Sequence, residues 1–317
     1  MPHYARRPRP VDGRRRKAEE SMDYRGKVVV ITGASSGIGR DAAVAFAKRG
    51  AIVVGVARRE SLLQELAGEC RRHAPDASYL AGDLGERGFA ERVVHETVAR
   101  HGRLDVLINN AGLPMHKQIY DVTPEDMDLQ MRVNFMACVW TTLAAIPYML
   151  RQGEGYVINV SSMAAKVAPP RETPYTAAKA AMDGFTAGLW SDLAGSNIHV
   201  SLVVPGPIDT EIWGKDDSPS AYSGPKYPPK IVTDALFEVI EKKVHERVVP
   251  RFSAQLVSAH LLRFFAPSVL LRGMAWMEPV APDVVAKARA RAAASTGRGG
   301  GGAAGGSASG GTGGGAG

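Results

Sequence analysis

The chain has 317 residues, of which 45% are hydrophobic and 22% charged, and its formal net charge is +7. This length suits one large domain or two small ones. Residues 1–21 supply +4 of the charge, through seven Lys or Arg and three Asp or Glu, so the rest is nearly neutral. No basic stripe with interleaved aromatic residues appears, which argues against nucleic-acid binding.

The first 21 residues are basic and contain no apolar core, so we do not expect them to be a secretory signal. We expect this segment to be disordered and the folded domain to begin at Met22. Cys70 and Cys138 have no metal-ligand spacing, so we expect no metal site. So few cysteines fit a reducing cytoplasm, which is the predicted location. We expect no window to reach the about 18–20 apolar residues of a membrane span.

A β-branched run at 27–31 (KVVVI) predicts a strand buried on both faces. A glycine-rich turn at 32–39 (TGASSGIG), a helix over 40–49 and a second buried strand over 51–56 follow it. Such glycines let a pyrophosphate approach the backbone, and the start of the helix offers it free N–H groups. The βαβ unit therefore predicts a dinucleotide site, with a ligand-free turn as the alternative.

Tyr175 and Lys179 are four residues apart in a predicted helix, and Ser162 stands 13 residues before the tyrosine. Residues at this spacing share a helix face. An ammonium close to a phenol favours the phenolate and lowers the phenol pKa. The pair is therefore a candidate proton donor and acceptor for an alcohol or a ketone.

The glycine spacing is Gly-x-x-x-Gly-x-Gly, and with four later stretches in order the chain resembles the short-chain dehydrogenase/reductase family. The resemblance covers residues 22–250. It implies an α/β fold: a Rossmann-type doubly wound parallel sheet in a single domain. The four stretches are Asp83-Leu84, residues 109–112 (NNAG), Asn134 and residues 205–210 (PGPIDT).

The resemblance implies that Ser162, Tyr175, Lys179 and Asn134 form the catalytic group. Tyr175 is the acid or base, Ser162 stabilises the developing alkoxide, Lys179 lowers the tyrosine pKa and holds the nicotinamide ribose, and Asn134 holds a water. Ser161 is the rival serine, but strand alternation points the two serines in opposite directions. Implied cofactor contacts are Gly33, Ser35, Ser36, Gly37, Ile38, Gly39, Arg58, Asp83, Leu84, Asn110, Ala111, Gly112, Tyr175, Lys179, Pro205, Gly206, Ile208 and Thr210.

The end of the second strand indicates which dinucleotide is bound. Residues 56–60 read VARRE, with no acid at the strand end to bind the adenosine ribose hydroxyls. A guanidinium suits a phosphate monoester, so we favour NADP(H) with Arg58 as its contact, and keep NAD(H) open. The alternative is that Arg58 and Arg59 only open the next helix in solvent. Arg40 is a further candidate for the phosphate.

The C-terminal part reads as an apolar helical extension over 251–295 and a disordered Gly/Ala/Ser tail over 296–317. Pro267 divides the apolar stretch 251–277 into two short helices. We favour a packed lid or dimer surface for this stretch. The alternative is peripheral contact with a membrane, because apolar bulk with basic residues suits a bilayer interface.

The loop from Pro207 to Lys230 carries Trp213, Tyr222 and Tyr227 and is expected to cover the substrate. We expect a hydrophobic ketone or secondary alcohol, and the resemblance implies a homo-oligomer. Two other functions stay open, a non-catalytic dinucleotide sensor or scaffold and an NAD-dependent sugar-nucleotide epimerase.

Overall fold

The computed structural model describes residues 22–214, 222, 224–251, 254–277 and 280–296. The predicted disordered segments 1–21 and 296–317 lie outside these residues, apart from Thr296. Among the described residues, seven strands form one parallel sheet in the order β3-β2-β1-β4-β5-β6-β7. Their bounds are β1 Val28–Thr32, β2 Ile52–Ala57, β3 Ser78–Ala81, β4 Val106–Asn109, β5 Gly155–Val160, β6 Ile198–Pro205 and β7 Glu246–Val249.

Successive residues of the central strands serve two separate cores. Val29 and Ile31 of β1 pack in one hydrophobic cluster, and Val28 and Val30 pack in the other. This alternation is the pleat of a strand covered on both faces, and it explains why the sequence there is continuously apolar. The predicted doubly wound sheet is therefore confirmed.

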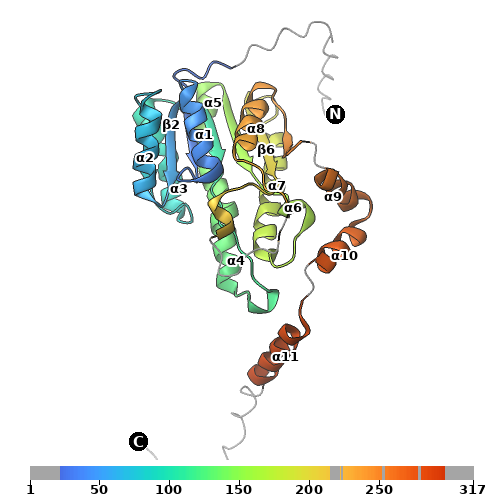
Figure 1. Ribbon diagram of the computed structural model, residues 1–317. Helices are drawn as coiled ribbons and strands as arrows, with labels where there is room; N and C mark the ends of the chain where they lie inside the picture. Colours follow the sequence, from blue (N-terminus) through green and yellow to red (C-terminus); the bar gives the residue numbers. More distant parts are fainter. Residues whose placement is uncertain (1–21, 215–221, 223, 252–253, 278–279, 297–317) are drawn as a thin grey trace, which may run out of the picture. The chain divides into compact units, whose positions relative to one another are not determined.

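Helices cover both faces of the sheet (Figure 1). The first cluster packs under α1 Gly37–Lys48, α2 Glu60–Arg71 and α8 Lys230–Glu241. The second packs under α3 Arg87–His101 and α5 Ala137–Gln152, and the Asn159 side chain on that face bonds Thr186 of α7 Thr173–Asp192. Shorter elements lie in the connections: η1 Ile119–Asp121, α4 Pro124–Met131, π-helical η2 Arg132–Met136, α6 Ala164–Val167 and η3 Glu211–Gly214.

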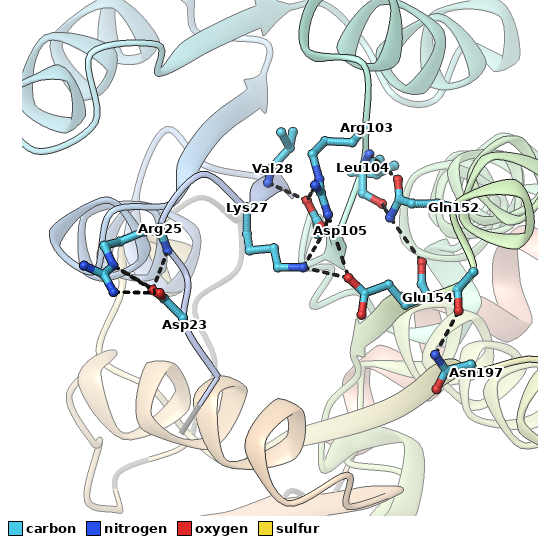
Figure 2. Close-up of polar contacts among 11 residues, drawn as sticks. Asp23, Arg25, Lys27, Val28, Arg103, Leu104, Asp105, Gln152, Glu154 and Asn197 are labelled. Atoms are coloured by element: carbon cyan, nitrogen blue, oxygen red, sulfur yellow. Dashed lines mark hydrogen bonds and ion pairs between the residues drawn. The ribbon is translucent and has the colours of Figure 1, made fainter. Parts of the chain in front are cut away.

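Charged side chains join the amino ends of β1, β4 and β5 (Figure 2). Lys27 lies 2.7 Å from Glu154 and 3.3 Å from the buried Asp105. The Asp105 carboxylate also pairs with Arg103 and accepts the backbone N–H of Val28 at 2.8 Å. Buried charges persist where partners surround them. The opposite edge, at the carboxyl ends of the strands, is where ligands bind in this kind of sheet.

Helices α4, η2 and α5 run continuously from Pro124 to Gln152. This stretch has 29 residues and a mean hydropathy of 1.5 in its most apolar window, enough by length and composition to cross a membrane. The expectation that no segment is so apolar is corrected. Ala137, Ala145 and Met149 of α5 lie in the core beside the sheet, so internal packing accounts for part of this composition.

The chain divides into two compact units, residues 1–275 and 276–317. In the first unit, α9 Ala254–Phe265 contacts α6. Helix α10 Pro267–Met277 comes next in the chain, and the division between the units falls within its last turn. Pro267 opens α10, so the proline separates two helices as predicted. The second unit contains α11 Pro282–Thr296.

Candidate active site

The candidate site lies between β1 and β4, where the strand order reverses. Thr32 ends β1, and its hydroxyl accepts hydrogen bonds from the backbone N–H groups of Asn110 and Ala111, both at 2.9 Å. The Asn110 side chain donates back to the Thr32 carbonyl at 3.0 Å. The glycine-rich loop and the loop after β4 are thereby fixed to each other at the ligand-binding position of open α/β sheets.

The glycine-rich loop packs so closely that it cannot accept side chains at two positions. Gly33 has φ +70°, and a Cβ there would lie 2.8 Å from the Ala111 Cα. A Cβ on Gly39 would lie 2.3 Å from the Gly33 carbonyl oxygen. Helix α1 begins in this loop, has no acid in its first turn, and receives no capping bond from Ser36. These free N–H groups and the positive helix end fit the pyrophosphate of a dinucleotide.

Arg59, rather than Arg58, lies against the glycine-rich loop. Its Nη2 donates to Ser36 Oγ at 2.6 Å and to Ser35 Oγ at 3.1 Å, and its Nη1 pairs with Glu211 Oε2 at 2.8 Å. Arg58 is exposed and makes no hydrogen bond or ion pair with the residues that the structure describes. A guanidinium therefore lies on the glycine-rich loop, but it belongs to Arg59 and not to the predicted Arg58.

The predicted cofactor contacts Asp83 and Leu84 follow β3. Leu84 is buried, and the exposed Asp83 accepts the backbone N–H of Gly85 at 2.9 Å. Arg40, the further candidate for the phosphate, instead pairs with Glu69 of α2 at 3.0 Å. Arg59 thus remains as the guanidinium held on the loop itself.

The segment after β6 reaches back to the glycine-rich loop. The Pro205 carbonyl accepts the backbone N–H of Met163 at 2.8 Å, and Ile208 is buried. A Cβ on Gly37 would lie 3.0 Å from Thr210 Cγ2, so Thr210 sits directly on the loop. The other predicted cofactor contacts on these loops are Ser35, Ser36, Ile38, Ala111 and Gly206.

Tyr175 and Lys179 lie one turn apart on α7, on one side of the site. The Lys179 ammonium is 5.9 Å from the Tyr175 ring centroid and donates to the Val160 carbonyl at 2.9 Å. A Cβ on Gly112 would lie 3.7 Å from Lys179 Nζ and 3.2 Å from Asn134 Oδ1. The ends of β4 and β5 therefore meet α7 around the lysine.

The pKa of the tyrosine moves opposite to the expected direction. Desolvation raises the pKa of Tyr175, a half-buried side chain, to about 12, although a hydrogen bond with Ser162 opposes the rise. Desolvation also lowers the pKa of Lys179 to about 8. Burial and the Glu172 charge raise this pKa, and Lys179 is not among the groups that lower it. The phenol is therefore protonated at neutral pH, the state that donates to a carbonyl oxygen.

The two serines after β5 have different partners, as strand alternation predicts. Ser161 is buried, and its hydroxyl donates to Asp183 of α7. Ser162 hydrogen-bonds with Tyr175 and accepts the backbone N–H of Ala164 at 3.1 Å. The structure thus brings Ser162 to the tyrosine and turns Ser161 away from it.

Asn134 is fully buried in the π-helical turn η2. Its Nδ2 donates to the Leu113 carbonyl at 2.9 Å and to Gln130 Oε1 at 2.6 Å, and its Oδ1 accepts the Leu113 N–H at 2.9 Å. Single π-turns in helices often mark functional sites. Because both amide hydrogens are used within the protein, the side chain fixes the loop beside Lys179.

A His–Glu pair near the tyrosine was missed by sequence reasoning. His116 Nε2 lies 2.7 Å from Glu172 Oε1, and the Glu172 charge contributes to the raised pKa of Tyr175. His116 follows β4 whereas Glu172 immediately precedes α7, so no local pattern connects them. Two further residues of the site were not predicted from the sequence. Thr32 accepts hydrogen bonds from the loop after β4, and Arg59 donates to the glycine-rich loop.

Aromatic side chains gather on the segment after β6. Trp213 Nε1 donates to the Ile208 carbonyl at 2.6 Å, and its ring stacks on Tyr222 with centroids 5.8 Å apart. The Lys226 ammonium lies 4.4 Å from the Trp213 ring centroid. Residues 215–221 and 223 of the predicted substrate loop lie outside the described residues.

A glycine-rich loop together with a Ser–Tyr–Lys group is typical of a dinucleotide-binding oxidoreductase. The proteins to which this chain is similar belong to the same class. A short chain dehydrogenase profile matches residues 27–220. An uncharacterized oxidoreductase of Thermotoga maritima is 39% identical over 190 residues, or 60% of this chain and 75% of that protein. The 11-beta-hydroxysteroid dehydrogenase 1A of Arabidopsis thaliana is 40% identical over 196 residues, or 61% of this chain. This chain spans 55% of the length of that plant protein.

A crystal structure of a short-chain dehydrogenase/reductase from Burkholderia phymatum in complex with NAD has the same fold. It aligns with a TM-score of 0.69 and 24% identity, over 76% of this chain and 94% of that one. The chain belongs to the short-chain dehydrogenase/reductase family of oxidoreductases, which bind NAD(P) and act on CH–OH groups.

Proposed function

We propose that the protein is an NADP(H)-dependent oxidoreductase that interconverts a secondary alcohol and a ketone, with Tyr175 as the general acid and base. The main support for the proposal is that Tyr175, Ser162 and the buried Lys179 lie together at the carboxyl ends of the strands. The glycine-rich loop lies at the same end of the sheet. A bound nicotinamide supplies or accepts the hydride.

In the reducing direction, the protonated Tyr175 hydroxyl donates its proton to the carbonyl oxygen of the substrate. The Ser162 hydroxyl donates a hydrogen bond to the same oxygen as negative charge develops. Lys179, charged below its pKa of about 8, would hold the ribose of the cofactor and stabilise the phenolate that Tyr175 becomes when it gives up its proton. Asn134 is a positioning residue, since its side chain fixes the backbone of Leu113 next to Lys179.

The preference for NADP(H) rests on Arg59. Its guanidinium is held at the edge of the glycine-rich loop by Ser35 and Ser36, where a phosphate monoester on the adenosine ribose would meet it. Glu211 is also paired with Arg59, so the carboxylate competes with a phosphate for the same guanidinium. Binding of the phosphate would release Glu211 from Arg59. The choice of cofactor is thereby linked to the segment after β6, which carries Glu211.

Exposed and aromatic side chains on the segments after β4 and β6 support a bulky apolar substrate. Ile119 and Tyr120 are exposed on η1 after β4, and Trp213 stacks with Tyr222 after β6. Large apolar side chains are rarely left exposed together unless they bind something. The plant relative named 11-beta-hydroxysteroid dehydrogenase 1A is consistent with such a substrate.

A homo-oligomer in the cytoplasm completes the proposal. Leu143 and Leu150 of α5 are exposed, and Phe135 is half-buried against Phe185 of α7, so the α5–α7 layer offers an apolar surface to a second copy. Light scattering of the purified chain measures this directly.

A panel of ketones tests the function. Wild-type protein with NADPH should oxidise the cofactor fastest with bulky apolar ketones, followed at the nicotinamide absorbance. Turnover with NADH alone would refute the cofactor preference. Tight cofactor binding with no turnover on any ketone, or on any alcohol in the reverse direction, would identify a sensor or scaffold instead.

A further inference from the structure

Helix α9 carries an apolar ridge that the described protein leaves uncovered. Leu261, Phe264 and Phe265 are spaced i, i+3, i+4 and so share one face. Their exposed fractions are 53%, 80% and 76%, and the two phenylalanine rings contact each other edge to face with centroids 5.0 Å apart. In α10, Val269 and Leu271 are exposed as well. We call the three α9 side chains the ridge.

The segment that carries the ridge has charged residues of one sign only. Residues 251–277 contain Arg251, Arg263 and Arg272 and no Asp or Glu. Arg263 and Arg272 are exposed, and neither forms an ion pair or hydrogen bond with another residue that the structure describes. The surface therefore suits a partner with an apolar interior and a negatively charged surface. An anionic lipid bilayer has both.

The size of the ridge argues against a dimer interface. Two phenylalanines and one leucine at these exposures present on the order of 400 Å² of apolar surface. A stable protein–protein interface takes about 800 Å² from each partner. Moreover, a second copy would bring its own arginines to the same surface, because a two-fold interface pairs identical patches.

We propose that the ridge docks the protein on an anionic lipid bilayer, with Phe264 and Phe265 below the headgroups and Arg263 and Arg272 among the lipid phosphates. Helix α9 contacts α6, which begins two residues after Ser162. Docking through α9 therefore places the bilayer on the Ser162 side of the protein, from which a substrate dissolved in the bilayer enters. Membrane binding itself does not depend on the proposed reaction.

The test is co-sedimentation of the full chain with vesicles of phosphatidylcholine and of phosphatidylcholine mixed with phosphatidylserine. We expect binding to the mixed vesicles that weakens as salt is added. The double substitution Phe264→Ser/Phe265→Ser should reduce the partition coefficient by about tenfold or more. Arg263→Gln/Arg272→Gln should reduce it by about tenfold to thirtyfold on the mixed vesicles at low salt, and little on phosphatidylcholine.

The matched control is Leu129→Ser, which removes an exposed leucine from α4, outside the ridge and outside the surface proposed for a second copy. It should leave vesicle binding unchanged. Thermal melting should be the same for the ridge variant and wild type, because the substituted side chains are exposed. Equal vesicle binding by wild type and the ridge variant overturns the proposal. A change of oligomer mass in the ridge variant, without a change in vesicle binding, identifies the ridge as a contact between copies and also overturns it.

Discussion

Substituting Arg59 should change cofactor choice, whereas substituting its neighbour Arg58 should not. Arg59 Nη2 is held by Ser36 at 2.6 Å and Ser35 at 3.1 Å, while Arg58 points to solvent without a described partner. A hydrogen bond to a charged group contributes about 1.5–3 kcal/mol, so Arg59→Ala should lower the NADPH-to-NADH ratio of kcat/KM by about tenfold to 150-fold. Arg58→Ala should change that ratio by about twofold or less.

The assay is the initial rate with each dinucleotide at subsaturating concentration and a fixed ketone. Glu211→Gln supplies the reciprocal variant: it removes the carboxylate paired with Arg59 at 2.8 Å and should raise the NADPH preference. All three variants should melt within a few degrees of wild type, because ion pairs this exposed contribute about 0–1 kcal/mol. An unchanged ratio in Arg59→Ala, or a large loss in Arg58→Ala, would refute the reasoning.

Three further outcomes follow from the site. Ser162→Ala should lower kcat by about 10²-fold or more through loss of alkoxide stabilisation, whereas Ser161→Ala should keep kcat and lower the melting temperature; equal kcat losses would contradict this. Gly39→Ala should abolish cofactor binding, as measured by titration, because its Cβ would lie 2.3 Å from the Gly33 carbonyl oxygen. Gly68→Ala is the control: its Cβ meets open space in α2, and it should raise the free energy of unfolding by about 0.5–1 kcal/mol. The kcat/KM for NADPH should fall as pH rises through about 8, where Lys179 loses its proton; a flat profile across that range would exclude this role.

The sheet was predictable because its strands are buried on both faces. A continuous apolar run such as 28–31 leaves few alternatives, and the glycine turn that follows it identifies the first βαβ unit. The Tyr175–Lys179 pair was equally accessible, since helix spacing alone places both on one face. Strand alternation is enough to separate Ser162 from Ser161, because neighbouring residues of an extended chain point in opposite directions.

The contacts that depend on tertiary geometry were not predictable. Choosing between Arg58 and Arg59 requires the direction of the backbone as it leaves β2, which a pair of identical residues does not reveal. The His116–Glu172 contact joins residues far apart in the chain. The tyrosine pKa was expected to fall, because an ammonium four residues away is visible in the sequence, whereas the burial that raises it is not.

The most direct test is single-turnover reduction of an accepted ketone by Tyr175→Phe, with NADPH affinity measured on the same sample. The variant should lose about 10²–10⁴-fold in rate. Its dissociation constant for NADPH should stay close to that of wild type, because the ring remains and only the hydroxyl is removed. A variant that reduces the ketone at the wild-type rate would contradict the assignment of Tyr175 as the proton donor.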